Sequence, residues 1–215
     1  MKERPILFSG PMVRAILDGR KTMTRRVVKP QPHEGVDAVE CQDQIIVGMN
    51  VPDQSGFAMM RGGVIESEAI RCPYGEPGDR LWVRETHKGW LTYQGQQVVQ
   101  YAASGTKQYH VDRPEGHPEG GMLNGECCAD KWRPSIHMPR WASRINLEIT
   151  GVRVERLQDI TDADALAEGA CHPDPRAKDG CYRSAFEGLW ESINGAASWD
   201  ANPFVWVVEF RSVEQ

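Results

Sequence analysis

A near-continuous apolar run close to the carboxyl terminus constrains the fold of this chain most strongly. Six of the seven residues from Phe204 to Phe210 are hydrophobic, and Pro203 directly precedes them. A strand with one buried face alternates apolar and polar residues, whereas a strand that is covered on both faces does not. The run therefore predicts a central strand of a sheet, with other layers packed against each of its faces.

Helix signals occur at three places, each with a capping residue and a closing glycine. They run from Ser9 to Gly19, from Thr161 to Gly169 and from Ser184 to Gly195. The longest strand signal, from Ser143 to Arg156, contains Gly151, where a bulge is expected. Because helices and strands do not alternate in a βαβ rhythm, the sequence predicts an α+β fold, a small mixed β-barrel with about three helices.

Composition bounds what the chain can bind. Its 215 residues suit one domain, and 25 basic against 30 acidic residues give a formal net charge of −5. That charge argues against a protein that coats nucleic acid through bulk attraction, but it leaves room for a local basic groove. No apolar run approaches the roughly 18 residues of a membrane span, and the amino terminus does not resemble a signal peptide. We therefore expect no membrane association and a cytoplasmic location.

Cysteine spacing gives no standard metal site. The six cysteines of a chain without an export signal are expected to be reduced. Cys171, His172 and Cys181 could supply three ligands, but their spacing matches no common zinc pattern, and the alternative is ordinary buried or surface thiols. No metal and no cofactor is predicted.

The densest group of reactive side chains lies after the first predicted helix, from Gly19 to Arg26. It packs four cations and two hydroxyls into eight residues, and no acid falls between Asp18 and Glu34. A solvated charge run usually carries acids among its bases. We therefore expect a functional site here, with Lys21 and Thr24 as its reactive groups. On a flat strand these side chains would face opposite sides, so the backbone is expected to bend or bulge between them.

Two glutamates are candidates for the carboxylate of such a site. Glu168 falls in the last turn of the second predicted helix, where the helix dipole disfavours a negative charge. Glu85 ends the apolar face of a predicted strand over residues 80–85, and Trp82 lies on the other face of that strand. Each glutamate is either solvated at the end of its element or directed into a pocket.

At several of these positions the chain resembles the ASCH family, which belongs to the PUA-like β-barrels. The matching parts are the signature Gly19-x-Lys21-x4-Arg26, the strand entry Pro77–Val83, the helix Thr161–Gly169 and the closing strand Val205–Phe210. The resemblance implies a single domain over residues 1–215, with loop-rich insertions near residues 33–72 and 87–135.

The best-understood close relatives within that family are small bacterial amidohydrolases that act on N4-acetylcytidine. Their catalytic lysine and threonine fall on Lys21 and Thr24. Their catalytic glutamate lies seven residues after a helix-capping threonine, which is the distance from Thr161 to Glu168. The resemblance thus implies an enzyme that removes the acyl group from a small modified nucleoside or base, an N4-acylated cytidine or cytosine.

The implied mechanism gives each of these residues a role. Lys21 is the base, if desolvation and nearby cations lower its pKa towards neutrality. Thr24 either attacks the carbonyl or positions a water that attacks, and Glu168 shuttles the proton. Arg26 or main-chain N–H groups near Gly19 would stabilise the oxyanion.

The remaining predictions concern the substrate and the rival functions. Arg26, Glu85 and Trp82 are the residues expected to bind the substrate. One rival is a PUA-like module that binds RNA through a basic groove with Trp132 or Trp141, and the other is a metal-independent ribonuclease. RNA is thus a second candidate partner, and the sequence implies no particular oligomeric state.

Overall fold

The computed structural model describes residues 1–31, 37–41, 56–61, 64–65, 71–91, 97–110, 131–170 and 181–213. The α-helices in these residues are α1 (Gly10–Leu17), α2 (Asp162–Ala167) and α3 (Cys181–Asn194), and short 3-10 turns cover Ser135–His137, Arg140–Ala142 and Leu157–Asp159. The strands are β1 (Glu3–Leu7), β2 (Met23–Val27), β3 (Asp37–Cys41), β4 (Gly56–Arg61), β5 (Val64–Ile65), β6 (Arg80–Arg84), β7 (His87–Leu91), β8 (Gln97–Tyr101), β9 (Lys107–His110), β10 (Asn146–Arg156) and β11 (Phe204–Val213).

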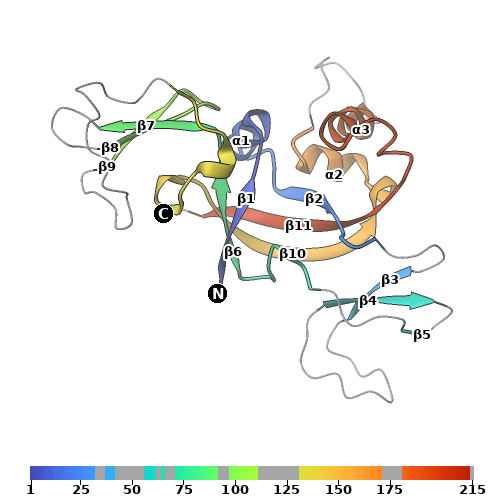
Figure 1. Cartoon of the computed structure of the whole chain (residues 1–215). Coiled ribbons are helices and arrows are strands. Elements are labelled where there is room, and N and C mark those ends of the chain that lie inside the picture. Colours follow the sequence, from blue (N-terminus) through green and yellow to red (C-terminus); the bar gives the residue numbers. More distant parts are fainter. Residues whose placement is uncertain are drawn as a thin grey trace.

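The α+β class and the three predicted helices are confirmed (Figure 1). Only the start of α3 differs from the prediction, since the helix begins at Cys181 and not at the expected cap Ser184. The main sheet has the order β1-β6-β10-β11-β2, with β1 parallel to β6 and the other pairs antiparallel. The register between β10 and β11 shifts between Ile149 and Gly151, which confirms the predicted bulge.

Strand β11 is the central, doubly covered strand that its apolar run predicts. It lies between β10 and β2, and its side chains alternate between two cores. Trp206 and Val208 pack in a first core with residues of α1, β1 and β6. Val205 and Val207 pack in a second core with residues of α2 and α3. The helices therefore cover both faces of the sheet at β11.

The sheet is open, so the prediction of a closed barrel is wrong for the described residues. Strands β1 and β2 form its two edges. In an antiparallel pair, every second residue directs its main-chain groups towards the partner strand. Thr22 and Val28 do so, since Phe210 N–H donates to Thr22 O and Val28 N–H donates to Phe204 O. The main-chain groups of Met23 and Arg25 therefore point away from β11. At the start of this free edge Thr22 N–H donates to Ala167 O of α2, at 2.8 Å. The end of a helix, and not another strand, meets the edge of β2.

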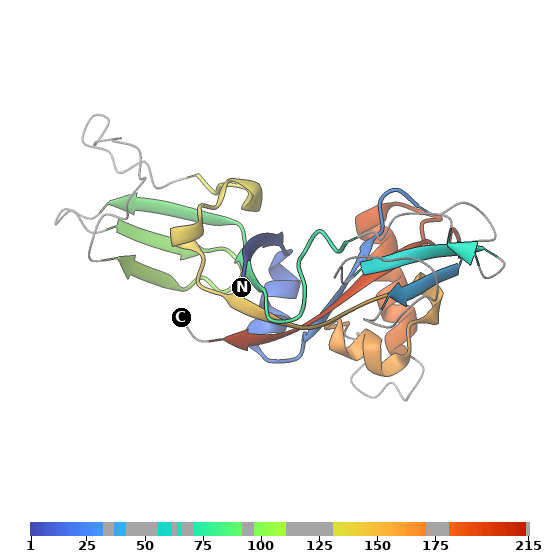
Figure 2. The same ribbon diagram turned by 90° about the horizontal axis from the view of Figure 1, so that it is seen from below.

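Two small sheets lie beyond the main sheet. One has the order β3-β4-β5 and the other β7-β8-β9, and they come from the two stretches that are expected to be insertions. Figure 2 shows them at opposite ends of the molecule, with the main sheet between them. None of the described helices is long and apolar enough to cross a membrane.

A buried ion pair joins the β7–β9 sheet to the main sheet. Glu85, directly after β6, is 2% exposed and accepts two hydrogen bonds from Arg144, at 2.8 and 3.0 Å. The Arg144 guanidinium lies 4.0 Å from the ring centroid of Tyr101 on β8. Both charges are thus compensated, and the aromatic ring belongs to the neighbouring sheet.

We expect Arg144→Met to lower the free energy of unfolding by about 3–5 kcal/mol, because it leaves the Glu85 carboxylate buried without its partner. Urea denaturation at neutral pH measures this loss. The matched control is Arg211→Met, which removes an exposed pair with Glu148 and should cost less than about 1 kcal/mol. Equal losses in the two variants would show that the Glu85–Arg144 pair does not anchor the sheet.

Candidate active site

The turn between α1 and β2 holds Lys21 in a fixed position. Helix α1 ends at Leu17, and Gly19 adopts a φ of +71°, a left-handed conformation that favours glycine. The N–H groups of Arg20 and Lys21 both donate to Ala15 O, at 2.9 and 3.0 Å. The predicted helix end at Gly19 is confirmed, and Lys21 leaves the turn just before β2 begins.

Helix α2 brings Glu168 to the same place. Thr161 caps α2 in a capping box with Asp164, as predicted, and Glu168 is the carboxyl-terminal cap. The next residue, Gly169, has a φ of +80°, and a Cβ on it would lie 2.9 Å from Ala15 Cβ and 3.2 Å from Lys21 Cβ. Only a residue without a side chain allows α2 to end so close to the Lys21 turn.

Lys21 and Glu168 form a buried ion pair. Lys21 Nζ lies 2.6 Å from Glu168 Oε2, and their side chains are 0% and 3% exposed. Nζ also donates to the main-chain oxygens of Met23 and Glu168, both at 2.8 Å. These three acceptors match the three donors of an ammonium group. The geometry therefore holds a protonated lysine, and its closest acceptor is a carboxylate that can take a proton from it.

The surroundings lower the pKa of Lys21. Burial is the largest cause, because it penalises the charged amine. The negative charge and the hydrogen bond of Glu168 act in the opposite direction, and the nearby Arg26 and Arg25 lower the pKa further. The net direction is the one that a lysine base requires.

Arg25 is one of the nearby cations expected to lower the pKa of Lys21, and it also contacts the carboxylates of the site, which the sequence does not indicate. Its side chain is 0% exposed, and it bonds to Glu155 at 2.5 and 3.0 Å and pairs with Asp164 at 3.2 Å. Its Nη1 lies 3.5 Å from Glu168 Oε1, an atom that accepts no hydrogen bond from any described residue. Arg153 extends the network to Glu155 and to Glu209. Arg25 thus holds the Glu168 carboxylate on the side away from Lys21.

Thr24 reaches the same site without a bulge in β2. The register of β2 with β11 is continuous, so Thr24 and Arg25 face opposite sides of the sheet. Both nevertheless line one cavity, because it lies at the free edge of β2 and extends to both faces. Lys21 reaches that edge from the preceding turn, where it donates to Met23 O. The expected bend thus lies before β2 and not within it.

The cavity at this edge has a volume of about 50 Å³. It is lined by Met12 of α1, Thr24, Arg25, Arg26 and Val27 of β2, Glu168, and Phe186, Leu189, Trp190, Ile193 and Asn194 of α3. Of the six predicted site residues, the cavity wall contains Thr24, Glu168 and Arg26, while Lys21 contacts that wall through Glu168.

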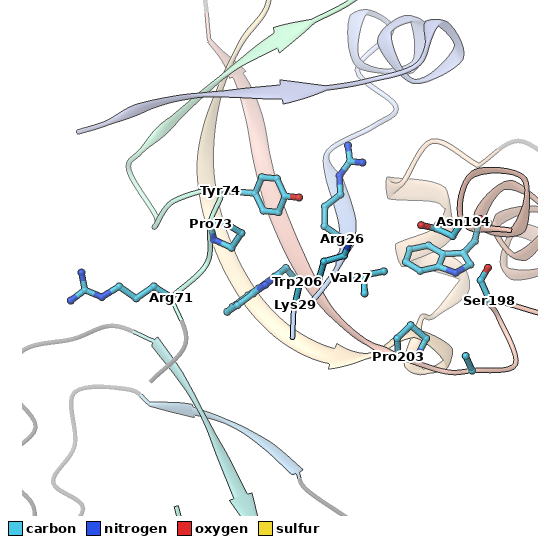
Figure 3. A pocket seen from close by; sticks show the side chains of 12 residues that line it. Arg26, Val27, Lys29, Arg71, Pro73, Tyr74, Asn194, Ser198, Pro203 and Trp206 are labelled. Atoms are coloured by element: carbon cyan, nitrogen blue, oxygen red, sulfur yellow. Dashed lines mark hydrogen bonds between the residues drawn. The ribbon is translucent and has the colours of Figure 1, made fainter. Parts of the chain in front are cut away.

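A larger groove of about 590 Å³ adjoins this cavity (Figure 3). The two share four wall residues, which are Arg26, Val27, Trp190 and Asn194. The groove continues along Tyr74 and Trp206. The periodicity of α3 assigns Trp190 to a core-facing stripe, and no sequence signal distinguishes a core tryptophan from one that also lines a groove.

The structure does not bring Glu85 and Trp82 to the site, which corrects their predicted role in substrate binding. Both belong to the β6 region, and β10 and β11 separate β6 from β2. Trp82 is buried beneath the guanidinium of Arg84, at 4.6 Å from its ring centroid, and Glu85 pairs with Arg144. Neither residue lines the cavity or the groove.

The other aromatic and metal candidates also lie apart from this site. Trp132 is 45% exposed with Lys88 over its ring, and Trp141 packs against the buried cluster around Tyr101. Cys171, His172 and the side chain of Cys181 lie outside the described residues. Within the described part of the chain, no three His, Cys, Asp or Glu side chains are grouped so that they could hold a metal ion.

Comparisons of the chain with protein-family profiles, with characterised proteins and with solved structures found no match. The function is therefore inferred from the geometry of the site and from the chemistry of its residues.

Proposed function

We propose that this protein is an amidohydrolase that removes the acyl group from N4-acylated cytidine or cytosine. The observation that carries the proposal is the buried Lys21–Glu168 pair beside a cavity that Thr24 lines. The ASCH resemblance implies a lysine, a threonine and a glutamate in one site, and the proposal is supported by the pairing of Lys21 with Glu168, 147 residues further along the chain, and by the cavity wall that Thr24 and Glu168 share. A binding protein needs neither a buried amine nor a carboxylate against it.

The pair provides a path for the proton. In the proposed reaction the Lys21 ammonium first passes a proton to Glu168 Oε2, and the neutral amine then accepts a proton from the attacking hydroxyl. The attacker is Thr24 or a water beside it; its oxygen bonds to the acyl carbon as the carbon–nitrogen bond breaks. Glu168 delivers its proton to the leaving N4 nitrogen. If Thr24 attacks, a water hydrolyses the resulting ester with the same two groups.

Cations beside the cavity favour the negative charge that develops on the acyl oxygen. Arg25 and Arg26 both line the cavity wall, in a site of low solvent exposure where such charges interact strongly. Arg26 Nη2 donates to Leu7 O at 2.7 Å, which restricts the movement of its guanidinium. We assign oxyanion stabilisation to this pair of arginines.

The rival functions, RNA binding and metal-independent RNA cleavage, would use Lys21 to contact a phosphate. A phosphate contact needs an accessible cation, and the Lys21 side chain is 0% exposed with all three of its donors in use. The burial of Lys21 thus favours proton transfer over contact with a nucleic-acid backbone.

Release of cytidine from N4-acetylcytidine tests the proposal. We expect Lys21→Met and Glu168→Gln to lower kcat by about 10²–10⁴-fold, since each removes one carrier of the proton. Thr24→Val should also inactivate, whereas Thr24→Ser retains a hydroxyl and part of the activity. Mass spectrometry of the rapidly quenched enzyme separates the two roles of Thr24, because an acyl group on Thr24 appears only if it attacks.

Lys2→Met is the control for these variants, because it removes an exposed lysine remote from the cavity. Circular dichroism establishes that each variant is folded. Undiminished turnover by folded Lys21→Met would exclude the lysine from the reaction, and failure of the wild type to release cytidine from any N4-acylated cytosine would end the proposal.

The pH dependence of kcat/KM should report Lys21. The reaction needs one proton on the Lys21–Glu168 pair, so activity should fall as the amine loses that proton to solvent, and because burial lowers the pKa of Lys21 below its ordinary value of 10.5, this fall should begin below that pH. The charge of Glu168 raises this pKa, so Glu168→Gln should lower it; in that variant the amine becomes neutral only by losing its proton to solvent, so the residual activity should rise with pH, at a lower pH than the wild-type fall. A wild-type activity that keeps rising through this range, or a residual activity in Glu168→Gln that falls, would mean that another group is titrating.

A further inference from the structure

The groove beside the small cavity has a charge opposite to that of the whole chain. Three cations line it, Arg26, Lys29 and Arg71, and no acidic residue is among its described wall residues. The chain carries a net charge of −5, so this local excess of positive charge is a property of the groove. Three aromatic residues, Tyr74, Trp190 and Trp206, complete a wall that suits a planar ring with an anionic group.

The groove has two chemically different ends. In Figure 3, Asn194 and Ser198 lie on one side and Arg71 on the opposite side, with Tyr74 and Trp206 between them. The Asn194 end adjoins the catalytic cavity, and it is also the carboxyl end of α3, where the helix dipole disfavours an anion. A ligand whose acyl group enters the cavity therefore has its anionic part towards Lys29 and Arg71.

These two cations are available to a ligand. Lys29 and Arg71 are exposed, and neither forms an ion pair with a carboxylate among the described residues. Arg26, in contrast, lies nearer the cavity and donates to Leu7 O. An anion away from the Asn194 end of the groove would thus meet cations that have no competing partner in the described part of the chain.

We propose that the groove binds a phosphate group through Lys29 and Arg71, so that the substrate of the proposed amidohydrolase is a phosphorylated cytidine. The phosphate belongs either to a free nucleotide or to a residue in a polynucleotide. The identity of the base rests on the proposed function, whereas the phosphate site rests on the groove alone.

Binding to the full chain tests the site without any turnover. We expect cytidine 5′-monophosphate to bind about 5–10-fold more tightly than cytidine in low-salt calorimetry, and the advantage to shrink as salt is added. The double variant Lys29→Glu/Arg71→Glu should lose the advantage while its affinity for cytidine stays the same. A tetracytidylate probe distinguishes the two sources, since tighter binding than to the mononucleotide indicates a polynucleotide and equal binding a free nucleotide.

The control variant Lys2→Glu/Lys131→Glu makes the same change in net charge at exposed lysines outside the groove, and it should retain the advantage. Equal affinity of the wild type for the two cytidine compounds, no binding of either at millimolar concentration, or an advantage that survives in Lys29→Glu/Arg71→Glu would overturn the phosphate site.

Turnover separates this inference from the proposed function. If cytidine 5′-monophosphate binds through Lys29 and Arg71 but no N4-acylated cytosine is hydrolysed, the phosphate site stands and the amidohydrolase proposal fails. If N4-acetylcytidine and its 5′-phosphate are hydrolysed with the same kcat/KM, the amidohydrolase stands and the phosphate site fails.

Discussion

The ion pair between Lys21 and Glu168 is the interaction on which the site depends. Moving two charges out of water costs several kcal/mol for each ion, and the cost is offset only when every charged atom finds a close partner. Lys21 meets three acceptors, and Arg25 approaches the far oxygen of Glu168. The pair also brings the end of α2 against the edge of β2, where a closed barrel would have placed another strand.

Opposing effects act on the pKa of Lys21. Burial, Arg25 and Arg26 favour the neutral amine, whereas Glu168 favours the ammonium. Without Glu168 the pKa of the buried lysine would be lower still, whereas an exposed lysine lacks the effect of burial and keeps its proton at neutral pH. The arrangement therefore suits a group that gives and takes a proton within one reaction, as the proposed amide hydrolysis requires.

The sequence predicts what depends on local periodicity and misses what depends on distant partners. The buried strand β11, the bulge at Gly151 and the capped helix α2 follow from short patterns, and all three are confirmed. Barrel closure depends on what covers the edge of β2, which no local pattern reports. The prediction that Glu85 belongs to the site is wrong because the sequence around a buried acid at the end of a strand is the same whether its partner is a substrate or, as here, Arg144. The sequence offers Arg25 only as a cation near Lys21, and its pairing with Glu155 does not follow from any local pattern because Glu155 is 130 residues away.

A double-mutant cycle on the unfolding free energy tests the pairing of Lys21 with Glu168 most directly. It compares the wild type, Lys21→Met, Glu168→Gln and the double variant by urea denaturation at neutral pH. Each single change should cost about 3–5 kcal/mol, because it leaves one buried charge without its partner. The double variant should be more stable than the sum of the single losses implies, by about 2 kcal/mol or more. Losses that add to within about 0.5 kcal/mol would contradict the pairing and, with it, the site.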